Sequence, residues 1–342
     1  PHDMKAATNE KAIEQLAPPA EVVIPMSMHF GAPCTPLVKA GDHVKVGQKI
    51  GEIAGLGAPI HASVSGVVKA VEPRPYVGGG KVMSVVIEND FQDTWGSVLT
   101  PHPDYSKLSC EEIVEIVKEA GITGMGGAGF PTHVKISSGV GKVDTLILNG
   151  AECEPYITSD NRCFLEDTHH VLGGIKAVMK YLNIPKCIIG IEGNKPEAIA
   201  KMKAAIDAPG IEVKELPCRY PQGAEKVLIE NCTGREVPFP GLPSDVGVIV
   251  MNVTSVAFVS KYLETGMPLT TKRLTVDGDI VKEPKNVEVL IGTPIQELLD
   301  FCGGLTAQPG KVLYGGPMMG TCVADLSQPI LKNNNAVLAF SE

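Results

Sequence analysis

The feature that most constrains this fold is a fourfold alternation of strand-like and helix-like segments in the middle of the chain. Apolar, β-rich segments occupy residues 145–148, 187–191, 211–216 and 246–253. Segments with helical periodicity or helix-start signals follow them at residues 164–182, 196–206, 223–231 and 255–264. Parallel strands need such crossover helices, so the alternation predicts an α/β domain with a parallel sheet covered by helices.

The chain before this alternation has a different pattern. Residues 21–90 contain short β-rich segments with Gly and Pro between them, which is typical of an all-β domain. The segments 39–48, 58–62 and 65–68 resemble the biotinyl/lipoyl barrel-sandwich fold. In that family a lysine at a hairpin tip carries the swinging arm. The corresponding segment here, 53–57, has no lysine, so the resemblance implies the fold without the carrier chemistry.

A third pattern follows the alternation. Residues 273–281 predict a hairpin with Asp277-Gly278 at its turn, and a strand at 287–291 and a short helix at 294–301 come next. This order suits a small β-grasp module. A chain of 342 residues has room for two or three domains of roughly 150 residues. We therefore expect a barrel-sandwich domain over 1–105, an α/β domain over 106–268, a β-grasp module over 269–325 and a linker over 326–342.

Composition excludes several classes of function. The net charge is −9 and there is no run of Lys or Arg, which argues against nucleic acid or anionic lipid as a partner. No apolar stretch approaches the 18 residues or so of a membrane span, and no signal peptide is recognisable. The nine cysteines include no C-x-x-C pair, so we expect reduced, mostly buried thiols. A metal site built from residues distant in sequence stays open. The chain begins at Pro1 and stops at Glu342, and we expect it to be part of a longer protein.

A glycine-rich segment lies just before the alternation, and we call residues 124–129 the glycine loop. Its sequence, Gly-Met-Gly-Gly-Ala-Gly, formally matches the dinucleotide-binding pattern G-x-G-x-x-G. The context differs, because a Rossmann fingerprint follows a strand and opens a helix. Here a helix that begins near Ser109 precedes the loop, and Pro131 follows it. The alternatives are a flexible turn and a loop that brings backbone close to a flat or phosphorylated ligand.

The residues around this loop carry a family resemblance. The loop, followed by Phe130-Pro131-Thr132 and Lys135, resembles the flavin-binding loop of the NADH-oxidising flavoprotein subunit of respiratory complex I. Three more segments resemble motifs of that family in the same order: 148–155, 220–226 and 250–255. The fold implied for residues 106–268 is a Rossmann-like domain that binds FMN and NADH.

The order of the domains narrows the resemblance further. A barrel-sandwich domain, this flavin domain and a soluble-ligand-binding (SLBB) β-grasp module resemble, in that order, the RnfC family of Rnf electron transport complexes. The sequence of residues 220–226, Tyr-Pro-Gln-Gly-Ala-Glu-Lys, also resembles the motif that is typical of that family. The family continues into a domain with two [4Fe-4S] clusters held by cysteine-rich runs. Those runs are absent here, so we expect the clusters outside this sequence, beyond residues 333–335.

The resemblance also implies roles for individual residues. It implies no catalytic acid or base and no metal ligand in this chain. The residues implied to contact FMN are Gly124, Gly126, Gly127, Lys135, Asn149, Glu152, Tyr220, Asn252 and Ser255. Those implied to contact NADH are Phe130, Glu154 and Glu225. Glu152 and Glu154 follow a strand at i and i+2, so we expect them to face the same side. A positive charge on Lys135 favours the anionic reduced flavin.

Three positions depart from the family's pattern. Two acids of the family motifs are replaced by Ala151 and Ala224, and a second NADH-stacking aromatic is replaced by Ser138. These departures predict weaker binding of flavin and nucleotide than in complex I.

The resemblance implies an oxidoreductase subunit, the NADH/FMN module of an ion-translocating ferredoxin:NAD⁺ oxidoreductase. It would pass hydride between NAD(H) and FMN, and single electrons between FMN and the clusters. The implied partners are the membrane and iron–sulfur subunits of the complex, with ferredoxin reached through one of them. The implied location is peripheral, on the cytoplasmic face of the membrane. Two alternatives stay open: a cobalamin reductase of bacterial microcompartments, and a docking scaffold whose flavin site is vestigial.

Overall fold

The alternating segment folds into the predicted parallel sheet. In the computed structural model, which describes residues 2–96 and 99–342, its strands are ordered β11–β10–β9–β12 and all pair in parallel. The strands are β9 (Thr145–Gly150), β10 (Lys186–Glu192), β11 (Ile211–Leu216) and β12 (Val248–Asn252). The strands β9, β10 and β12 are predominantly apolar, as expected where helices cover a sheet on both faces, whereas the edge strand β11 carries three charged residues.

The helices of the α/β domain agree with the prediction at most positions. They are α1 (Cys110–Glu119), α2 (Thr132–Gly139), α3 (Ser159–Glu166), α4 (Thr168–Leu182), α5 (Pro196–Ala205), α6 (Glu225–Thr233) and α7 (Val253–Thr265), with short 3₁₀ turns η1 (Tyr105–Lys107) and η2 (Pro243–Val246). The helix that precedes the glycine loop begins with a capping box, in which Ser109 accepts a hydrogen bond from the Glu112 backbone N–H.

Two details of these helices differ from the prediction. The helix expected over 164–182 is divided into α3 and α4 at Asp167, whose backbone leaves helical geometry (φ −120°, ψ 33°). The Asp167 carboxylate is held at this break by Lys261 and Arg273. The short helix α2 begins directly after Pro131, so the glycine loop does open a helix although no strand precedes it.

The N-terminal domain is the expected pair of small sheets. One sheet has the order β2 (Glu21–Pro25), β8 (Lys81–Asn89), β7 (Gly66–Pro75) and β4 (His43–Val44). The other has the order β3 (Thr35–Pro36), β5 (Lys49–Glu52) and β6 (Ile60–His61). Residues 53–57 form the tip between β5 and β6, where a barrel-sandwich carrier domain would place its lysine.

The third domain has the β-grasp elements β13 (Thr271–Asp277), β14 (Lys285–Leu290), α8 (Ile295–Phe301), β15 (Lys311–Tyr314) and β16 (Thr321–Cys322). The predicted hairpin over 273–281 is wrong in its second half, because β13 pairs with β14 and residues 278–284 form the connection. Gly278 begins that connection with φ +124°, and a Cβ there would lie 2.0 Å from the Ala339 carbonyl oxygen. The chain therefore turns away from β13 at this glycine.

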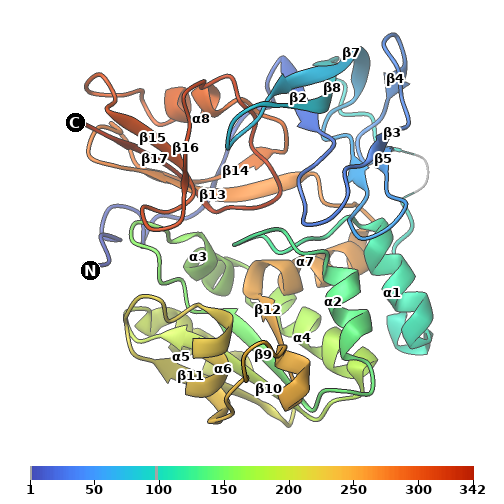
Figure 1. Cartoon of the computed structure of the whole chain (residues 1–342), viewed down its shortest axis with the longest axis vertical. Coiled ribbons are helices and arrows are strands. Elements are labelled where there is room, and N and C mark those ends of the chain that lie inside the picture. The colour runs from blue at the N-terminus through green and yellow to red at the C-terminus, as the bar shows by residue number, and fades with distance from the viewer. Residues whose placement is uncertain (1, 97–98) are drawn as a thin grey trace.

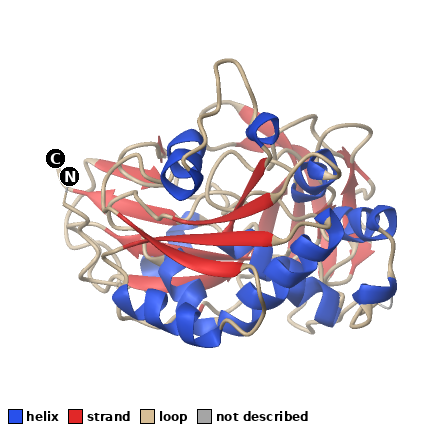
Figure 2. Ribbon diagram, turned by 90° about the horizontal axis from the view of Figure 1, so that it is seen from below, coloured by secondary structure: helices blue, strands red, loops and turns tan. Residues whose placement is uncertain are grey.

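The expected linker over 326–342 is also wrong. Residues 336–340 form β17, which pairs in parallel with β13 and antiparallel with β15 in the middle of a six-stranded sheet. At the other end of the chain, β1 (Glu14–Gln15) leaves the barrel-sandwich region and pairs with β14 at the edge of the same sheet. Both termini lie on the same side of the molecule in Figure 1 and in Figure 2, and Figure 1 shows them separated along the long axis.

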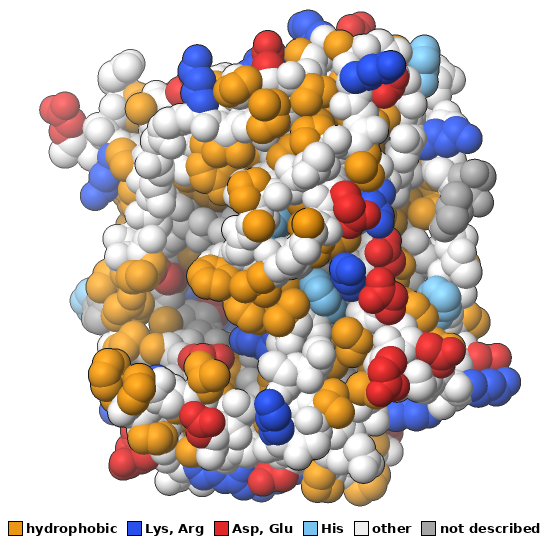
Figure 3. Space-filling model, turned by 45° about the vertical axis from the view of Figure 1, so that its right-hand side comes forward, with side chains coloured by type: hydrophobic (Ala, Val, Ile, Leu, Met, Phe, Trp, Pro, Cys, Tyr) orange, Lys and Arg blue, Asp and Glu red, His pale blue; other side chains and the backbone are white. Residues whose placement is uncertain are grey.

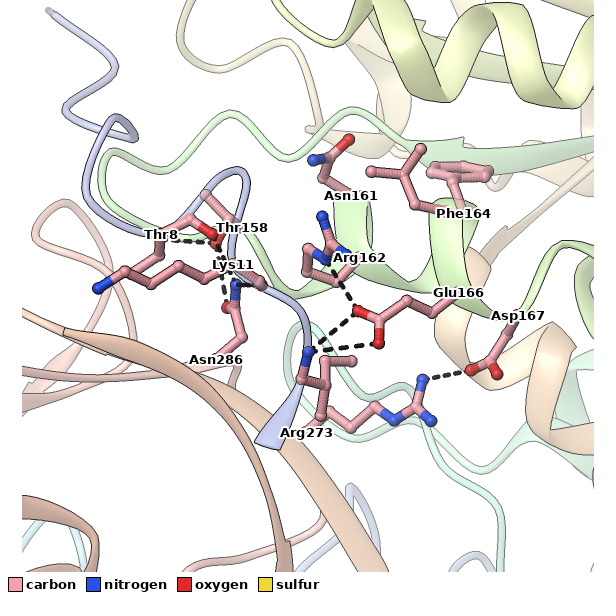
Figure 4. Close-up of polar contacts among 12 residues, drawn as sticks. Thr8, Lys11, Thr158, Asn161, Arg162, Phe164, Glu166, Asp167, Arg273 and Asn286 are labelled. Carbon is pink, nitrogen blue, oxygen red and sulfur yellow. Dashed lines mark hydrogen bonds and ion pairs between the residues drawn. The ribbon is translucent and has the colours of Figure 1, made fainter. Parts of the chain in front are cut away.

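The N-terminal segment also ties the third sheet to α3. Thr8 and Thr158 share a hydroxyl hydrogen bond of 2.7 Å, and the Thr158 hydroxyl donates to Asn286 Oδ1 at 3.0 Å. Further along the segment, the backbone N–H of Ile13 donates to Glu166 at 3.1 Å. Figure 4 shows these groups converging between α3 and the β-grasp sheet, beside Arg273 and Asp167.

The barrel-sandwich and β-grasp domains lie side by side on the α/β domain (Figure 1). A continuous cluster of buried apolar side chains extends through all three, and includes Val22, Ile113 and Leu274. Lys332 joins the three domains directly, because its buried ammonium donates to Pro59 O at 2.8 Å and to Gly121 O at 2.7 Å. Burial lowers the pKa of Lys332 to about 7. The domains therefore form one packed unit.

On the face shown in Figure 3, acidic and basic side chains alternate with apolar ones, and no continuous basic patch is visible on it. Among residues 2–96 and 99–342, no helix has the length and apolar character needed to cross a membrane.

Candidate functional site

The glycine loop connects α1 to α2, and the residues at its two ends are paired with each other. Thr123 and Pro131 pair at its base, and the backbone N–H of Gly124 donates to the carbonyl of Phe130 at 2.9 Å. Asn252, the last residue of β12, lies against Gly126, and Ser255, in the first turn of α7, bonds to the loop. This is the carboxyl end of the parallel sheet. The loop therefore lies at the end of the sheet where ligands of α/β domains usually bind.

The α/β domain and the β-grasp domain hold the loop between them. Ser255, at the start of α7, donates from its hydroxyl to Thr123 O at 2.9 Å and accepts from the Met125 N–H at 3.2 Å. Lys272, from β13, donates to the Met125 carbonyl at 2.7 Å. The second acceptor of Lys272 is Asn335 Oδ1 at 2.8 Å.

Lys272 was not among the residues predicted from the sequence. Its side chain is almost completely buried, and burial lowers its pKa to about 7. The sequence did contain a signal that Lys272 is buried, because Lys272 shares one face of β13 with the apolar Leu274 and Val276. A lysine on the core side of a strand needs partners, and here one partner is the glycine loop.

The glycines of the loop have two different surroundings. A Cβ on Gly126 would lie 3.0 Å from Asn252 Nδ2 and 3.2 Å from Asn335 Nδ2, so this part of the loop packs on amide side chains. A Cβ on Gly127 would have no described atom within 4 Å, and one on Gly124 only ordinary contacts. The loop is therefore supported from one side and presents bare backbone on the other.

Lys135, Phe130 and Glu225 lie together beside the loop. The Lys135 ammonium donates to Val250 O at 2.8 Å and is 3.4 Å from Glu225 Oε1. It is also 5.9 Å from the centre of the Phe130 ring. About a third of the Lys135 side chain and rather more of Glu225 are exposed. The structure thus brings together two residues implied to contact NADH and one implied to contact FMN.

The two asparagines use their amides within the chain. Asn149, at the end of β9, donates to Gly223 O at 3.1 Å and accepts from the Ala151 N–H at 3.1 Å. It thereby connects the segment after β9 to the turn before α6, where the half-buried Tyr220 lies. Asn252 caps α7 through the N–H groups of Thr254 and Ser255, and its Nδ2 donates to Asp160 at 3.2 Å.

Glu152 is bound to the start of α3. Its carboxylate accepts from the backbone N–H groups of Asp160 at 2.6 Å and Asn161 at 3.3 Å, as helix-capping acids do. Burial, with a further contribution from Asp160, raises the pKa of Glu152 to about 7. Its two oxygens are thus bonded to the backbone at the start of α3.

Glu154 has different partners from Glu152. Its two oxygens accept from the backbone N–H groups of Met318 at 3.0 Å and Met319 at 2.9 Å, in the loop between β15 and β16. A Cβ on Gly316 would lie 2.0 Å from Glu154 Oε2, so only glycine fits there. Glu152 and Glu154 thus bond to different segments, α3 and the loop between β15 and β16. The two-residue period of a strand does not extend to them, because β9 ends at Gly150.

Lys5 is a second buried lysine that was not predicted from the sequence. Its ammonium donates to the carbonyls of Glu154, at 2.9 Å, and Ile157. Burial lowers its pKa to about 8. The N-terminal segment therefore fixes the backbone that carries both glutamates, a contact that no local pattern indicates.

The core thiol Cys163 and a large cavity lie apart from the glycine loop, whereas Cys153 lies between Glu152 and Glu154 and accepts from the Gly223 N–H at 3.4 Å. Burial raises the pKa of Cys163 to about 12, which makes it an unreactive core thiol. No three His, Cys, Asp or Glu side chains in the described part of the chain are grouped to hold a metal ion. A cavity of about 740 Å³ lies between the barrel-sandwich and α/β domains, lined by Lys49, His61, Glu119 and Tyr262 among others. No residue of the glycine loop lines that cavity.

Each domain matches a known family. Residues 1–92 match the RnfC barrel sandwich hybrid domain, residues 117–261 the Nuo51 FMN-binding domain, and residues 273–321 the SLBB domain. These matches define a three-domain chain in which a Nuo51-type FMN-binding domain lies between a barrel-sandwich domain and an SLBB domain.

Curated relatives give the particular family. The chain is 46% identical to the C subunit of the proton-translocating ferredoxin:NAD(+) oxidoreductase complex of Clostridium ljungdahlii, over 100% of this chain and 75% of that protein. It is 47% identical to the C subunit of the Na(+)-translocating complex of Acetobacterium woodii, over 95% and 74%. It is 39% identical to the C subunit of the ion-translocating oxidoreductase complex of Vibrio cholerae, of which it spans only 44%. The chain belongs to the RnfC family, the C subunits of ion-translocating ferredoxin:NAD(+) oxidoreductase complexes.

A solved structure shares the fold. The crystal structure of an NAD⁺-reducing [NiFe]-hydrogenase in the air-oxidised state superposes with a TM-score of 0.62 at 23% identity. The match covers 70% of this chain and 48% of the hydrogenase chain. At this identity the similarity supports the architecture only.

Proposed function

We propose that this chain is the NADH- and FMN-binding module of an Rnf-type ferredoxin:NAD⁺ oxidoreductase. In this role it exchanges hydride between NAD(H) and FMN, and single electrons between FMN and two [4Fe-4S] clusters outside residues 1–342. The relatives from Clostridium ljungdahlii and Acetobacterium woodii carry the name of that oxidoreductase complex. The match of residues 117–261 to an FMN-binding domain supports the cofactor.

The observation that carries the proposal is the form of the glycine loop. Ser255 and Lys272 fix the loop from behind, while Gly127 has open space in front. Bare backbone lets a flat ring or a phosphate approach closely, and its N–H groups can donate to an anion. These residues fit FMN, which has both a planar ring system and a phosphate.

The side chains next to the loop supply the charge that the reaction needs. Lys135 lies beside Phe130, the residue that follows the loop, and its ammonium would favour negative charge on a reduced flavin bound there. Glu225 is an acceptor suited to ribose hydroxyls, and Lys135 orients it at 3.4 Å. Bound FMN would take two electrons with a hydride and release them one at a time. The protein supplies position and electrostatics, and no general base is needed.

The complex-level part of the proposal follows from the family. We expect membrane and iron–sulfur subunits as partners, ferredoxin contacted through one of them, and a peripheral position on the cytoplasmic face of the membrane. The relatives are named as the C subunits of complexes, which supports an assembly of several subunits.

Anaerobic absorption spectroscopy of the purified chain tests the proposal. We expect added FMN to bind and its visible absorbance to bleach on addition of NADH. Failure to bind FMN would favour the alternative of a scaffold with a vestigial site. Flavin binding together with co-purification of a corrinoid protein, rather than membrane subunits, would favour the cobalamin reductase.

A further inference from the structure

We propose that Phe30, in the barrel-sandwich domain, is a specificity-determining residue of the nucleotide site and stacks on the adenine ring of NADH. This inference rests on the proposed function, because it assigns a new residue to the same site. Phe30 lies outside residues 117–261, which match the FMN-binding domain, and no motif of that domain includes it.

Phe30 extends the row of side chains beside the glycine loop. Its ring lies 5.7 Å from that of Phe130, with 30° between the ring planes. The Lys135 ammonium is 5.9 Å from the centre of the Phe130 ring and 3.4 Å from Glu225. The four side chains thus offer two stacked rings, a cation and a carboxylate in sequence. An adenosine diphosphate group needs these features for its base, its phosphates and its ribose.

The Phe30 side chain is 53% exposed, although its ring is apolar. Stacking on Phe130 covers part of the ring and leaves the rest open to solvent. A partly covered aromatic ring that is held in place offers a surface on which another flat ring can stack. On the α2 side of Phe130 the chain has Ser138, whose hydroxyl is bonded to Lys135 O at 2.8 Å. The second aromatic ring of this site therefore comes from the neighbouring domain.

Backbone contacts fix Phe30 to the glycine loop. The Phe30 N–H donates to Gly129 O at 2.9 Å. Gly129 has φ +75°, and a Cβ there would approach Met28 O at 3.2 Å and His29 Cα at 3.3 Å. The two loops therefore meet backbone to backbone, and the position of Phe30 is set by the loop that would hold the flavin.

The hairpin tip of the barrel-sandwich domain supports this arrangement from behind. The Ala32 N–H donates to Leu56 O at 2.9 Å. Gly31 has φ +125°, and a Cβ there would lie 2.1 Å from the same carbonyl oxygen, so no larger residue fits. The tip at 53–57, which bears the swinging arm in carrier domains, here braces the loop that presents Phe30. This gives the domain a function in nucleotide binding despite its missing lysine.

The test compares ligands with and without adenine. We would measure ADP-ribose binding by calorimetry, and the anaerobic bleaching of bound FMN by NADH and by reduced nicotinamide mononucleotide. In Phe30→Ala, ADP-ribose and NADH should bind about tenfold more weakly, the usual effect of losing one aromatic–base stack. The dependence on reduced nicotinamide mononucleotide and the affinity for FMN should stay within about twofold, because neither ligand contains adenine.

Two variants serve as controls. Phe91→Ala removes a ring of similar exposure (62%) just after β8 in the same domain, and should change none of these values. Phe30→Tyr keeps the stacking surface and should bind ADP-ribose nearly as the wild type does. Because Phe30 is half exposed and its backbone bond remains in alanine, Phe30→Ala should fold normally.

Three results would overturn the inference. These are unchanged ADP-ribose binding in Phe30→Ala, an equal loss with reduced nicotinamide mononucleotide, or a loss of FMN affinity, which would make Phe30 part of the flavin site. A wild-type protein that binds FMN but neither NADH nor ADP-ribose would instead contradict the proposed function. The two failures are therefore distinguishable.

Discussion

The two flanks of the glycine loop satisfy their polar groups in different ways. The inner flank is defined here as Lys272, which contacts the loop, together with Lys5, Glu152 and Glu154, which hold the segment after β9. Each of these side chains bonds to two or more groups of the protein. On the outer flank, defined as Phe30, Phe130, Lys135 and Glu225, the side chains are half exposed and loosely paired.

This difference separates scaffold from contact surface. A buried charge whose hydrogen bonds are complete loses stability if a ligand replaces its partners. A half-exposed charge pair contributes little to stability and can exchange its partner for a ligand at small cost. The outer flank is therefore where we place the nucleotide, and the inner flank is what holds the loop and its neighbours in position. The predictions below test this division.

The largest expected effect is on the open face of the loop. Gly127→Val should lower FMN affinity at least about a hundredfold, or about 3 kcal/mol, because its side chain would occupy the space in front of the backbone. No described atom lies within 4 Å of this Cβ position, so the protein should remain folded. FMN titration and thermal unfolding measure the two properties.

Two other glycine variants serve as comparisons for Gly127→Val. Gly55→Val, in an equally open position of the barrel-sandwich tip, should leave FMN binding unchanged. Gly126→Val should remove FMN binding and lower stability too, because its Cβ would meet the Asn252 and Asn335 amides. Normal FMN binding by Gly127→Val would show that the open face is not the flavin site.

The next effect compares one glutamate from each flank. Glu225→Gln should weaken NADH binding by about ten- to a hundredfold, the effect of losing a charged hydrogen bond of about 1.5–3 kcal/mol. Glu154→Gln should weaken it less, because the Glu154 carboxylate is already bonded to the Met318 and Met319 N–H groups. FMN binding should persist in both. The kinetics of anaerobic flavin bleaching by NADH measure the NADH affinity of each variant. A larger loss of affinity in Glu154→Gln than in Glu225→Gln would contradict the assignment of the nucleotide to the outer flank.

Much of the fold and part of the site could be predicted from local sequence. The four strand–helix units are local patterns, and all four are present, although Asp167 divides one helix. The glycine loop contacts Ser255 and Lys135 contacts Val250, because the end of β12 and the start of α7 receive both the loop and α2. The prediction of a linker at 326–342 was wrong because β17 is short and is stabilised by pairing with β13 and β15, which are distant in sequence.

The inner flank was not predictable in the same way. Lys5 reaches Glu154 across about 150 residues of sequence, and Lys272 reaches Met125 across a similar span. Such contacts depend on how domains pack, which periodicity does not report. Phe30 is a third example, since its neighbours are Phe130 and Gly129 of another domain.

The third prediction concerns a lysine of the inner flank. Lys272→Met should lower the free energy of unfolding by about 1–2 kcal/mol, because Met125 O and Asn335 Oδ1 lose their buried donor. The matched variant on the outer flank, Lys135→Met, should cost less than about 1 kcal/mol. Urea unfolding at pH 8 measures both. Equal losses would show that burial does not distinguish the two lysines.

The smallest effect is a pH dependence that originates at Glu152. Burial raises its folded pKa to about 7, above the ordinary value of 4.5. The protein therefore binds a proton at Glu152 between these pH values while the unfolded chain releases it. This stabilisation is complete below about pH 4.5 and is lost as the pH rises to about 7.

Glu152→Gln cannot titrate and keeps an oxygen for the Asp160 N–H. From pH 5 to pH 7.5, the wild type should therefore lose stability relative to this variant by on the order of 1 kcal/mol. Taking the difference between the two proteins cancels the other groups that titrate in this range, such as Asp277, whose pKa burial raises to about 6. Urea unfolding at the two pH values gives the result. If the difference in unfolding free energy between the two proteins does not change with pH, Glu152 is ionised in the folded state. Its bonds to α3 would then be those of an ionised helix cap.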